Sequence, residues 1–133
     1  MDRVFLDANV LFSAAYRIDA GLLRLWKLTH ARLCSSRYAL EEARANLADK
    51  HQRERLTALS EALELFEAGG SVLPRAISLP DKDVPIILAA IAARATHLLT
   101  GDIRHFGPYF GKAIRGIEIA RPGDYLRMRA TKI

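Results

Sequence analysis

The chain has 133 residues, half of them hydrophobic, which predicts one compact domain over residues 1–133 with little room for a second. Its single cysteine excludes an internal disulfide, and no apolar stretch approaches the roughly 20 residues of a membrane span, so we expect a cytoplasmic protein with no membrane partner. The formal net charge of +5 favours a polyanionic partner such as nucleic acid.

The hydrophobic pattern predicts strands alternating with helices. In the first third of the chain we expect a strand over residues 3–6, a helix over 9–16, a helix carrying Leu22, Leu25 and Trp26, and a strand over 33–35. Ser36 is the predicted N-cap of the next helix, which carries Glu41 and Glu42. A further helix is expected to end at Gly69-Gly70, because hydrophobic residues recur at helical spacing through Leu56, Leu59, Leu63 and Phe66.

The second half of the chain continues the alternation. We expect a short strand at Val72-Leu73, a loop over 74–82, an apolar helix that begins at Asp83 and Pro85 and continues to Ala95, a strand over 97–100, a glycine-rich loop over 101–116, a strand over 117–120, and a short helix after Pro122. This order predicts an α/β fold with three layers. Helices cover both faces of a central parallel sheet of about five short strands.

Four acidic residues are spread over the whole chain, namely Asp7, Glu42, Asp83 and Asp102. Asp7 and Asp102 each follow a short apolar strand, and the carboxyl ends of parallel strands form the edge where α/β folds bind ligands. Each residue alone also fits an ordinary role as a turn residue, a helix cap or a solvated charge. Carboxylates gathered at one edge repel one another, and bound divalent cations relieve that repulsion.

The type of ligand indicates which metal would bind and which reaction it would assist. Oxygen ligands suit Mg²⁺ or Mn²⁺. Such an ion lowers the pKa of a bound water and neutralises charge on a phosphodiester. Metal-assisted cleavage of phosphodiester bonds therefore fits the acidic pattern.

Four segments resemble the PIN domain, in the subgroup that includes VapC-type toxins and stand-alone PIN nucleases. They are LDANVL (6–11), SRYALEEARANL (36–47), DKDVPIILAAIAARA (81–95) and HLLTGDIRHF (97–106). The most specific part is the apolar helix led by an aspartate and followed by a strand that ends in Thr-Gly-Asp. The resemblance implies a PIN-like fold in which Asp7, Glu42, Asp83 and Asp102 form a catalytic pocket that binds Mg²⁺ or Mn²⁺.

The resemblance also implies a function and further residue roles. The protein would be a divalent-metal-dependent endoribonuclease that hydrolyses RNA, and the toxin component of a type II toxin–antitoxin pair. Its partners would be RNA, an antitoxin protein and a second copy of the chain in a homodimer. Asn9 and Thr100 would support the acidic residues, while Arg104 and His105 are predicted to contact substrate phosphates.

Three questions stay open at this point. Glu41 is adjacent to Glu42, and helix geometry alone does not decide which one faces the pocket, although Glu42 matches the family pattern better. Asp81 precedes Asp83 by two residues, and we expect it at the pocket rim. The alternative function is a catalytically silent PIN-like module that binds RNA or a protein.

Two other aspartate-based families fit less well. Phosphotransferases of the haloacid dehalogenase type carry a second aspartate two residues after the first, where this chain has Asn9. A receiver-like signalling domain needs a lysine late in the sheet, whereas Lys112 falls in a predicted loop.

Overall fold

A computed structural model describes the backbone of residues 1–131 and the side chains of residues 1–129. One sheet has the strand order β3-β2-β1-β4-β6-β5. The strands are β1 (Asp2–Leu6), β2 (Ala31–Ser35), β3 (Glu64–Leu65), β4 (His97–Leu99), β5 (Ala113–Ile114) and β6 (Ile117–Ala120). All neighbouring strands are parallel except β5 and β6. The predicted α/β class is confirmed, with six strands in place of about five.

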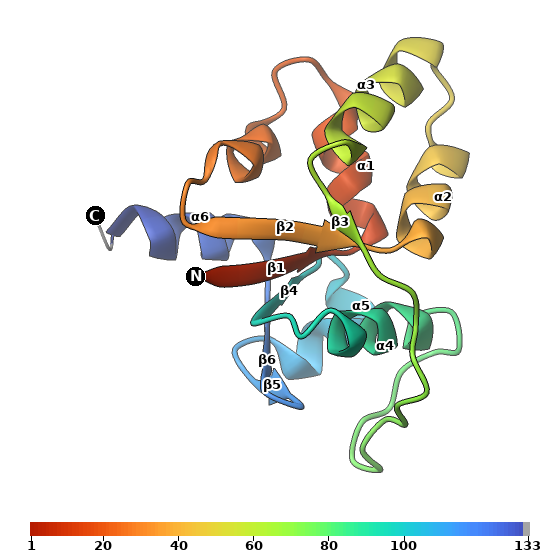
Figure 1. Ribbon diagram of the computed structural model, residues 1–133, viewed down its shortest axis with the longest axis vertical. Helices are drawn as coiled ribbons and strands as arrows, with labels where there is room; N and C mark the ends of the chain where they lie inside the picture. Colours follow the sequence, from red (N-terminus) through yellow and green to blue (C-terminus); the bar gives the residue numbers. More distant parts are fainter. Residues whose placement is uncertain (132–133) are drawn as a thin grey trace.

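Helices cover both faces of the sheet (Figure 1). One side carries α1 (Ala8–Tyr16), the 3₁₀ helix η1 (Gly21–Lys27), α2 (Arg37–Asn46) and α3 (Lys50–Ser60). The other side carries α4 (Val84–Ala92) and α5 (Ile103–Phe106). The 3₁₀ helix η2 (Gly107–Tyr109) follows α5, and α6 (Pro122–Thr131) follows β6. Within residues 1–131, no helix is both long enough and apolar enough to cross a bilayer.

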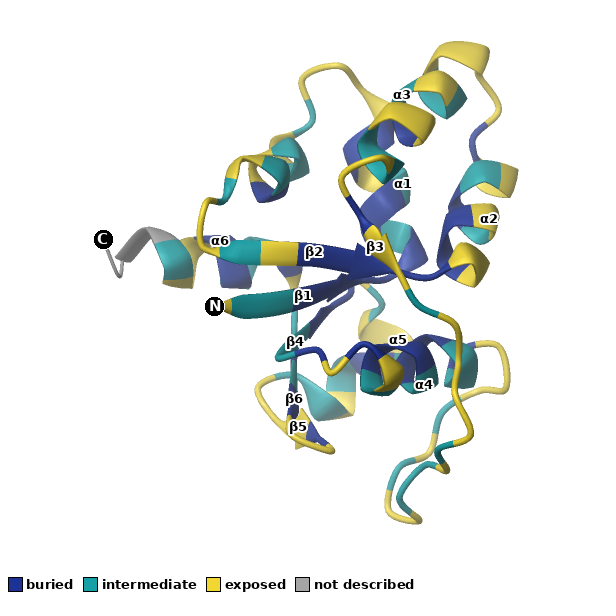
Figure 2. Cartoon of the chain, in the orientation of Figure 1, coloured by how far each residue is buried: buried dark blue, intermediate teal, exposed yellow. Residues whose placement is uncertain are grey.

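The core lies along the central strands. Phe5 and Leu6 in β1 and Leu98 and Leu99 in β4 are fully buried, as expected for strands that helices cover on both faces. Figure 2 shows this buried centre and the connection from β3 to α4, whose residues before Asp83 are exposed or of intermediate burial. The apolar helix α4 packs its buried residues, which include Ile87, into the same hydrophobic cluster.

The third strand lies earlier than predicted. The predicted helix end at Gly69-Gly70 is wrong, because α3 ends at Ser60 and Glu64–Leu65 pair in parallel with the end of β2. Both strand residues are exposed, so backbone hydrogen bonds, such as that from Phe66 N–H to the Ser35 carbonyl (2.9 Å), define the strand. The predicted strand at Val72-Leu73 is wrong, because these residues belong to the connection between β3 and α4.

Two other predicted boundaries are wrong. Helix α4 ends at Ala92, before the predicted Ala95, because Arg94 adopts the left-handed conformation that ends helices (φ 54°). The predicted loop over 101–116 contains α5, η2 and β5. Strand β5 turns into β6 through Arg115 and Gly116, both with positive φ, as a tight two-residue hairpin requires.

Two buried serines fix the end of β2 and the start of α2. The Ser36 hydroxyl accepts a hydrogen bond from Ala39 N–H (3.1 Å), which confirms the predicted N-cap. The Ser35 hydroxyl donates to the Leu6 carbonyl at the end of β1 (2.7 Å). These contacts set the start of the helix that carries Glu42.

We expect Ser36→Ala to lower the free energy of unfolding by about 1 kcal/mol, because the N-terminal N–H groups of α2 lose their cap. Urea unfolding followed by circular dichroism measures the change. Ser13→Ala, on the exposed side of α1, is the control and should not be destabilising. Equal stabilities for Ser36→Ala and the parent would contradict this role of the cap.

Candidate metal and active site

The candidate site begins where β1 and β4 end side by side. Leu6 pairs with Leu99 in the parallel register, so Asp7 and Thr100 follow at the same edge of the sheet. Asp7 N–H donates to the Leu99 carbonyl (3.0 Å), which continues the pairing by one residue. Two segments far apart in the sequence therefore present polar side chains together.

Thr100 and Asn9 hold the Asp7 carboxylate. The Thr100 hydroxyl donates to Asp7 Oδ2 (2.8 Å), and Asn9 Nδ2 lies 3.3 Å from the same oxygen. Asn9 Oδ1 accepts from Gly101 N–H (2.8 Å), and Thr100 Oγ1 accepts from Asp102 N–H (3.1 Å). The two residues predicted to be supporting thus connect Asp7 to the segment that carries Asp102.

Asp7 is an unusual N-cap because it is almost fully buried. Its side chain is the N-cap of α1, where Oδ1 accepts from Ala8 N–H (2.7 Å). Burial is the main cause that raises the pKa of Asp7 to about 6; hydrogen bonds from Thr100 and Ala8 oppose the shift, and the charges of Asp83 and Glu42 add to it. A carboxylate at this position gains from a nearby cation.

Helix α2 presents one face to this carboxylate. Glu42 and Asn46, four residues apart, both line the same pocket as Asp7, whereas Glu41 is exposed and lies outside that lining. Tyr38, one turn before Glu42, has a raised pKa, first through burial and then through the charges of Glu42, Asp83 and Asp7. The structure therefore places Glu42, and not Glu41, with the other acids.

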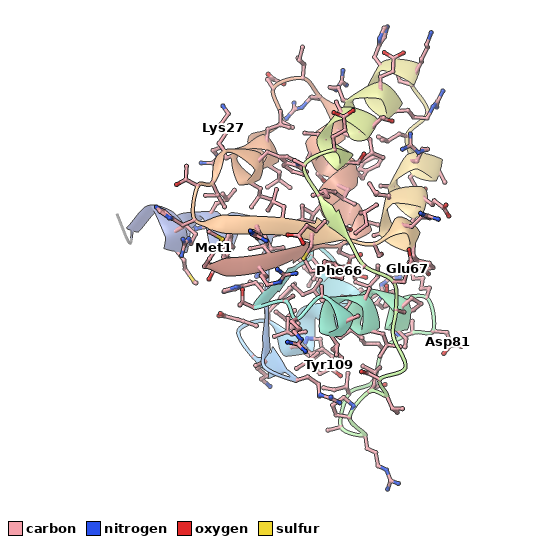
Figure 3. All side chains as sticks on the ribbon, in the orientation of Figure 1. Met1, Lys27, Phe66, Glu67, Asp81 and Tyr109 are labelled. Carbon is pink, nitrogen blue, oxygen red and sulfur yellow. The ribbon has the colours of Figure 1, made fainter. Side chains whose placement is uncertain are left out.

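Asp83 reaches the site at the end of the long connection over residues 66–83. The Tyr38 hydroxyl donates to the Lys82 carbonyl (2.7 Å), which ties this connection to α2. Asp83 stands at the N-cap position of α4, but its side chain makes no capping hydrogen bond. Asp81 is exposed, lies in the part of the connection that leads into α4 (Figure 3), and is not among the residues that line the pocket.

Asp102 and His105 complete the acidic edge. Asp102 Oδ1 accepts from His105 N–H (3.1 Å) at the start of α5. The His105 ring turns back, so that Nδ1 lies 2.8 Å from Asp102 Oδ2 and 2.8 Å from Asp83 Oδ2. Burial raises the pKa of Asp83, the neighbouring His105 opposes this shift, and the charge of Asp102 adds to it. Arg104 points to solvent on the same turn.

All four predicted acids line one pocket of about 450 Å³. The lining comprises Asp7, Ala8, Asn9, Phe12, Glu42, Asn46, Lys82, Asp83 and Asp102. Sequence reasoning missed Phe12, Asn46 and Lys82. The spacing from Glu42 to Asn46 could have indicated Asn46, because residues four apart share a helix face.

The donor set fits a divalent cation. Among the described residues, Asp83, Asp102 and His105 form a group whose ligand atoms lie within 4.8 Å of one another. Asp83 Oδ2 and His105 Nδ1 are buried and have no hydrogen-bond partner, which is costly unless a further group satisfies them. Asp7 and Glu42 add two carboxylates from the same pocket. The residues present therefore suit a cation with oxygen-rich coordination.

Comparison with known proteins gives the family. Residues 3–104 match the model of the PIN domain, and the chain belongs to that family. The fold is similar to a chain in the crystal structure of VapBC2 from Rickettsia felis bound to a DNA fragment from the promoter. The two chains are 19% identical with a TM-score of 0.65, and the match covers 90% of this chain and 98% of that one. No curated protein matches the sequence.

We expect the ionised form of Asp7 to destabilise the metal-free fold. Its pKa is 3.8 ordinarily and about 6 in the folded protein, so the unfolded chain loses this proton at lower pH and stability falls as the pH rises through this window. As the pH rises from about 3 to about 7, the free energy of unfolding of Asp7→Asn should therefore increase by about 3 kcal/mol relative to that of the parent.

Chemical denaturation in EDTA at a series of pH values measures this change. Asp7→Asn also changes hydrogen bonds, but that contribution to the free energy of unfolding does not vary with pH. The pH dependence of the difference between the variant and the parent therefore reports the titration of Asp7. Asp19→Asn is the matched control, since Asp19 is exposed. A difference between Asp7→Asn and the parent that does not vary with pH would show that Asp7 titrates normally.

Proposed function

We propose that this PIN-domain protein is a divalent-metal-dependent endoribonuclease with Asp7, Glu42, Asp83 and Asp102 as its catalytic residues. The observation that supports the proposal is that four acids from separate segments line a single pocket. Two of them, Asp7 and Asp83, have raised pKa values. Carboxylates concentrated in this way favour the binding of a cation over remaining as isolated charges.

Each residue has a distinct part in this mechanism. Asp7, Glu42, Asp83 and Asp102 would hold Mg²⁺ or Mn²⁺, which supplies an activated water and neutralises charge on the phosphodiester. Thr100 and Asn9 fix the orientation of Asp7 through the hydrogen bonds described above. Fixed ligand orientation limits the rearrangement that the reaction requires.

Cationic side chains near the pocket would hold the substrate backbone. Lys82 lines the pocket beside Asp83, and Arg104 is exposed two residues after Asp102. Phosphate contacts of this kind position a nucleic acid without reading its sequence. The formal net charge of +5 also favours a polyanion. We assign RNA as the substrate, with DNA as the comparison in the assay.

We further propose that the protein is the toxin of a type II toxin–antitoxin pair and acts in the cytoplasm. The support is the likeness in fold to a chain of VapBC2. Its antitoxin would cover the acidic pocket and so block access to the catalytic carboxylates. A homodimer also remains a prediction. Co-expression with the product of an adjacent gene, followed by purification and an activity assay, tests the antitoxin.

The alternative is a catalytically silent module that binds RNA or a protein. Such a module would not need several carboxylates in one pocket, where their mutual repulsion lowers the stability of the fold. Here Asp7 is buried with a pKa of about 6, and Glu42, Asp83 and Asp102 line the same pocket. This arrangement favours an active enzyme, and a cleavage assay separates the two functions.

We expect Asp7→Asn and Asp102→Asn each to reduce Mn²⁺- or Mg²⁺-dependent RNA cleavage by at least about a hundredfold, because loss of a ligand removes several kcal/mol of stabilisation from the transition state. Labelled RNA and DNA of one sequence, with and without EDTA, give the rates. Circular dichroism confirms folding.

Asp19→Asn, which removes an exposed carboxylate, is the control and should cleave at the parent rate. Cleavage by Asp7→Asn and Asp102→Asn at the parent rate would overturn the proposal. Binding of RNA without cleavage under every metal condition would favour the silent module.

A further inference from the structure

His105 lies beside two of the acidic residues, Asp83 and Asp102. Its ring belongs to α5 and is mostly buried. Nδ1 lies 2.8 Å from Asp83 Oδ2 and 2.8 Å from Asp102 Oδ2. The ring therefore joins the end of the connection before α4 to the segment that follows β4.

Both contacts are ion pairs if the His105 ring is protonated, but neither has the geometry of a good hydrogen bond. His105 Nδ1 and Asp83 Oδ2 are both buried, and neither has a hydrogen-bond partner. Hydrogen bonds weaken steeply away from linearity, so contacts of this length without a hydrogen bond indicate poor alignment of Nδ1 with the two oxygens. Because both atoms are buried without a hydrogen-bond partner, a third group that contacts them would satisfy them.

The two distances from Nδ1 suit neighbouring ligands of one metal ion. In an octahedral site with metal–ligand distances of about 2.1 Å, neighbouring ligand atoms lie about 3.0 Å apart. The two distances of 2.8 Å from Nδ1 are close to this value. All three ligand atoms lie within 4.8 Å of one another, so a single cation could contact Asp83, Asp102 and His105 together.

We propose that His105 is a nitrogen ligand of the metal site, through Nδ1, alongside Asp83 and Asp102. This inference rests on the proposed function, because it requires the acidic pocket to bind a cation. It adds a ligand of a different chemical type to an oxygen-only set. The assignment leaves Nε2 of His105 for the phosphate contact that the sequence predicts.

A nitrogen ligand changes which cation the site prefers. Mg²⁺ takes oxygen ligands and keeps several waters, whereas imidazole suits first-row transition metals. The mixed set of two carboxylates and one imidazole therefore favours Mn²⁺ over Mg²⁺. His105 would contribute more to the affinity for Mn²⁺ than to that for Mg²⁺.

Electron paramagnetic resonance of Mn²⁺ tests the ligand directly, without any cleavage measurement. The metal-free protein is titrated with Mn²⁺, and electron spin echo modulation detects a coordinated ¹⁴N nucleus. For the parent we expect a ¹⁴N coupling. In His105→Gln we expect the coupling to be lost and the dissociation constant for Mn²⁺ to rise about tenfold or more. Competition with Mg²⁺ should show that the preference for Mn²⁺ falls in this variant.

The control is His30→Gln, the same substitution at an exposed histidine next to β2, which should keep both the coupling and the affinity. Circular dichroism and thermal unfolding in EDTA show whether each variant folds. The alternative is that a protonated His105 only neutralises the two carboxylates and competes with the metal.

Each other outcome overturns a distinct claim. If His105→Gln binds Mn²⁺ as tightly as the parent or more tightly, and the parent shows no ¹⁴N coupling, the nitrogen ligand is wrong while the metal site stands. If the parent binds neither Mn²⁺ nor Mg²⁺, the proposed function fails together with the inference.

Discussion

The hydrogen bond from the Thr100 hydroxyl to Asp7 joins the ends of two central strands and fixes the buried carboxylate on which the site depends. It exists because the register of β1 on β4 places residues 7 and 100 next to each other. The bond offsets only part of the cost of burying a charge, since the pKa of Asp7 still rises to about 6. A cost of about 3 kcal/mol is a large fraction of the stability of a typical domain.

The other acids reach the pocket on segments held mainly by polar contacts. Glu42 depends on the Ser36 cap at the start of α2. Asp83 depends on the connection over residues 66–83, which the Tyr38 hydroxyl ties to α2. Because each of these segments is fixed separately, small changes in the contacts would move single carboxylates while the apolar core stays intact. The fold thus separates stability, which resides in the sheet and α4, from the geometry of the site.

The sequence predicted the parts of the site that follow from strand ends. Asp7 and Asp102 follow apolar strands, and parallel pairing brings them to one edge. Glu42 could not be distinguished from Glu41 by periodicity, because the choice depends on how α2 is rotated against α1. Strand β3 was missed because it is an exposed edge of two residues with no hydrophobic signal. The position of the His105 ring depends on side-chain packing that sequence patterns do not contain.

The aspartates at the two ends of β1, Asp2 in its first position and Asp7 directly after it, differ in how the fold compensates their charge. Burial acts to raise the pKa of Asp2, but a hydrogen bond from Tyr125 (2.6 Å) and the charges of His97 and Arg129 lower it overall. Asp2 therefore has its counter-charges within the fold. At the other end of the strand, Asp7 has hydrogen bonds but no Lys, Arg or His in an ion pair among the described residues, and its pKa rises. The same residue type has cationic partners within the protein at one end of the strand, whereas at the other end it has only hydrogen bonds, as the proposed metal site would require.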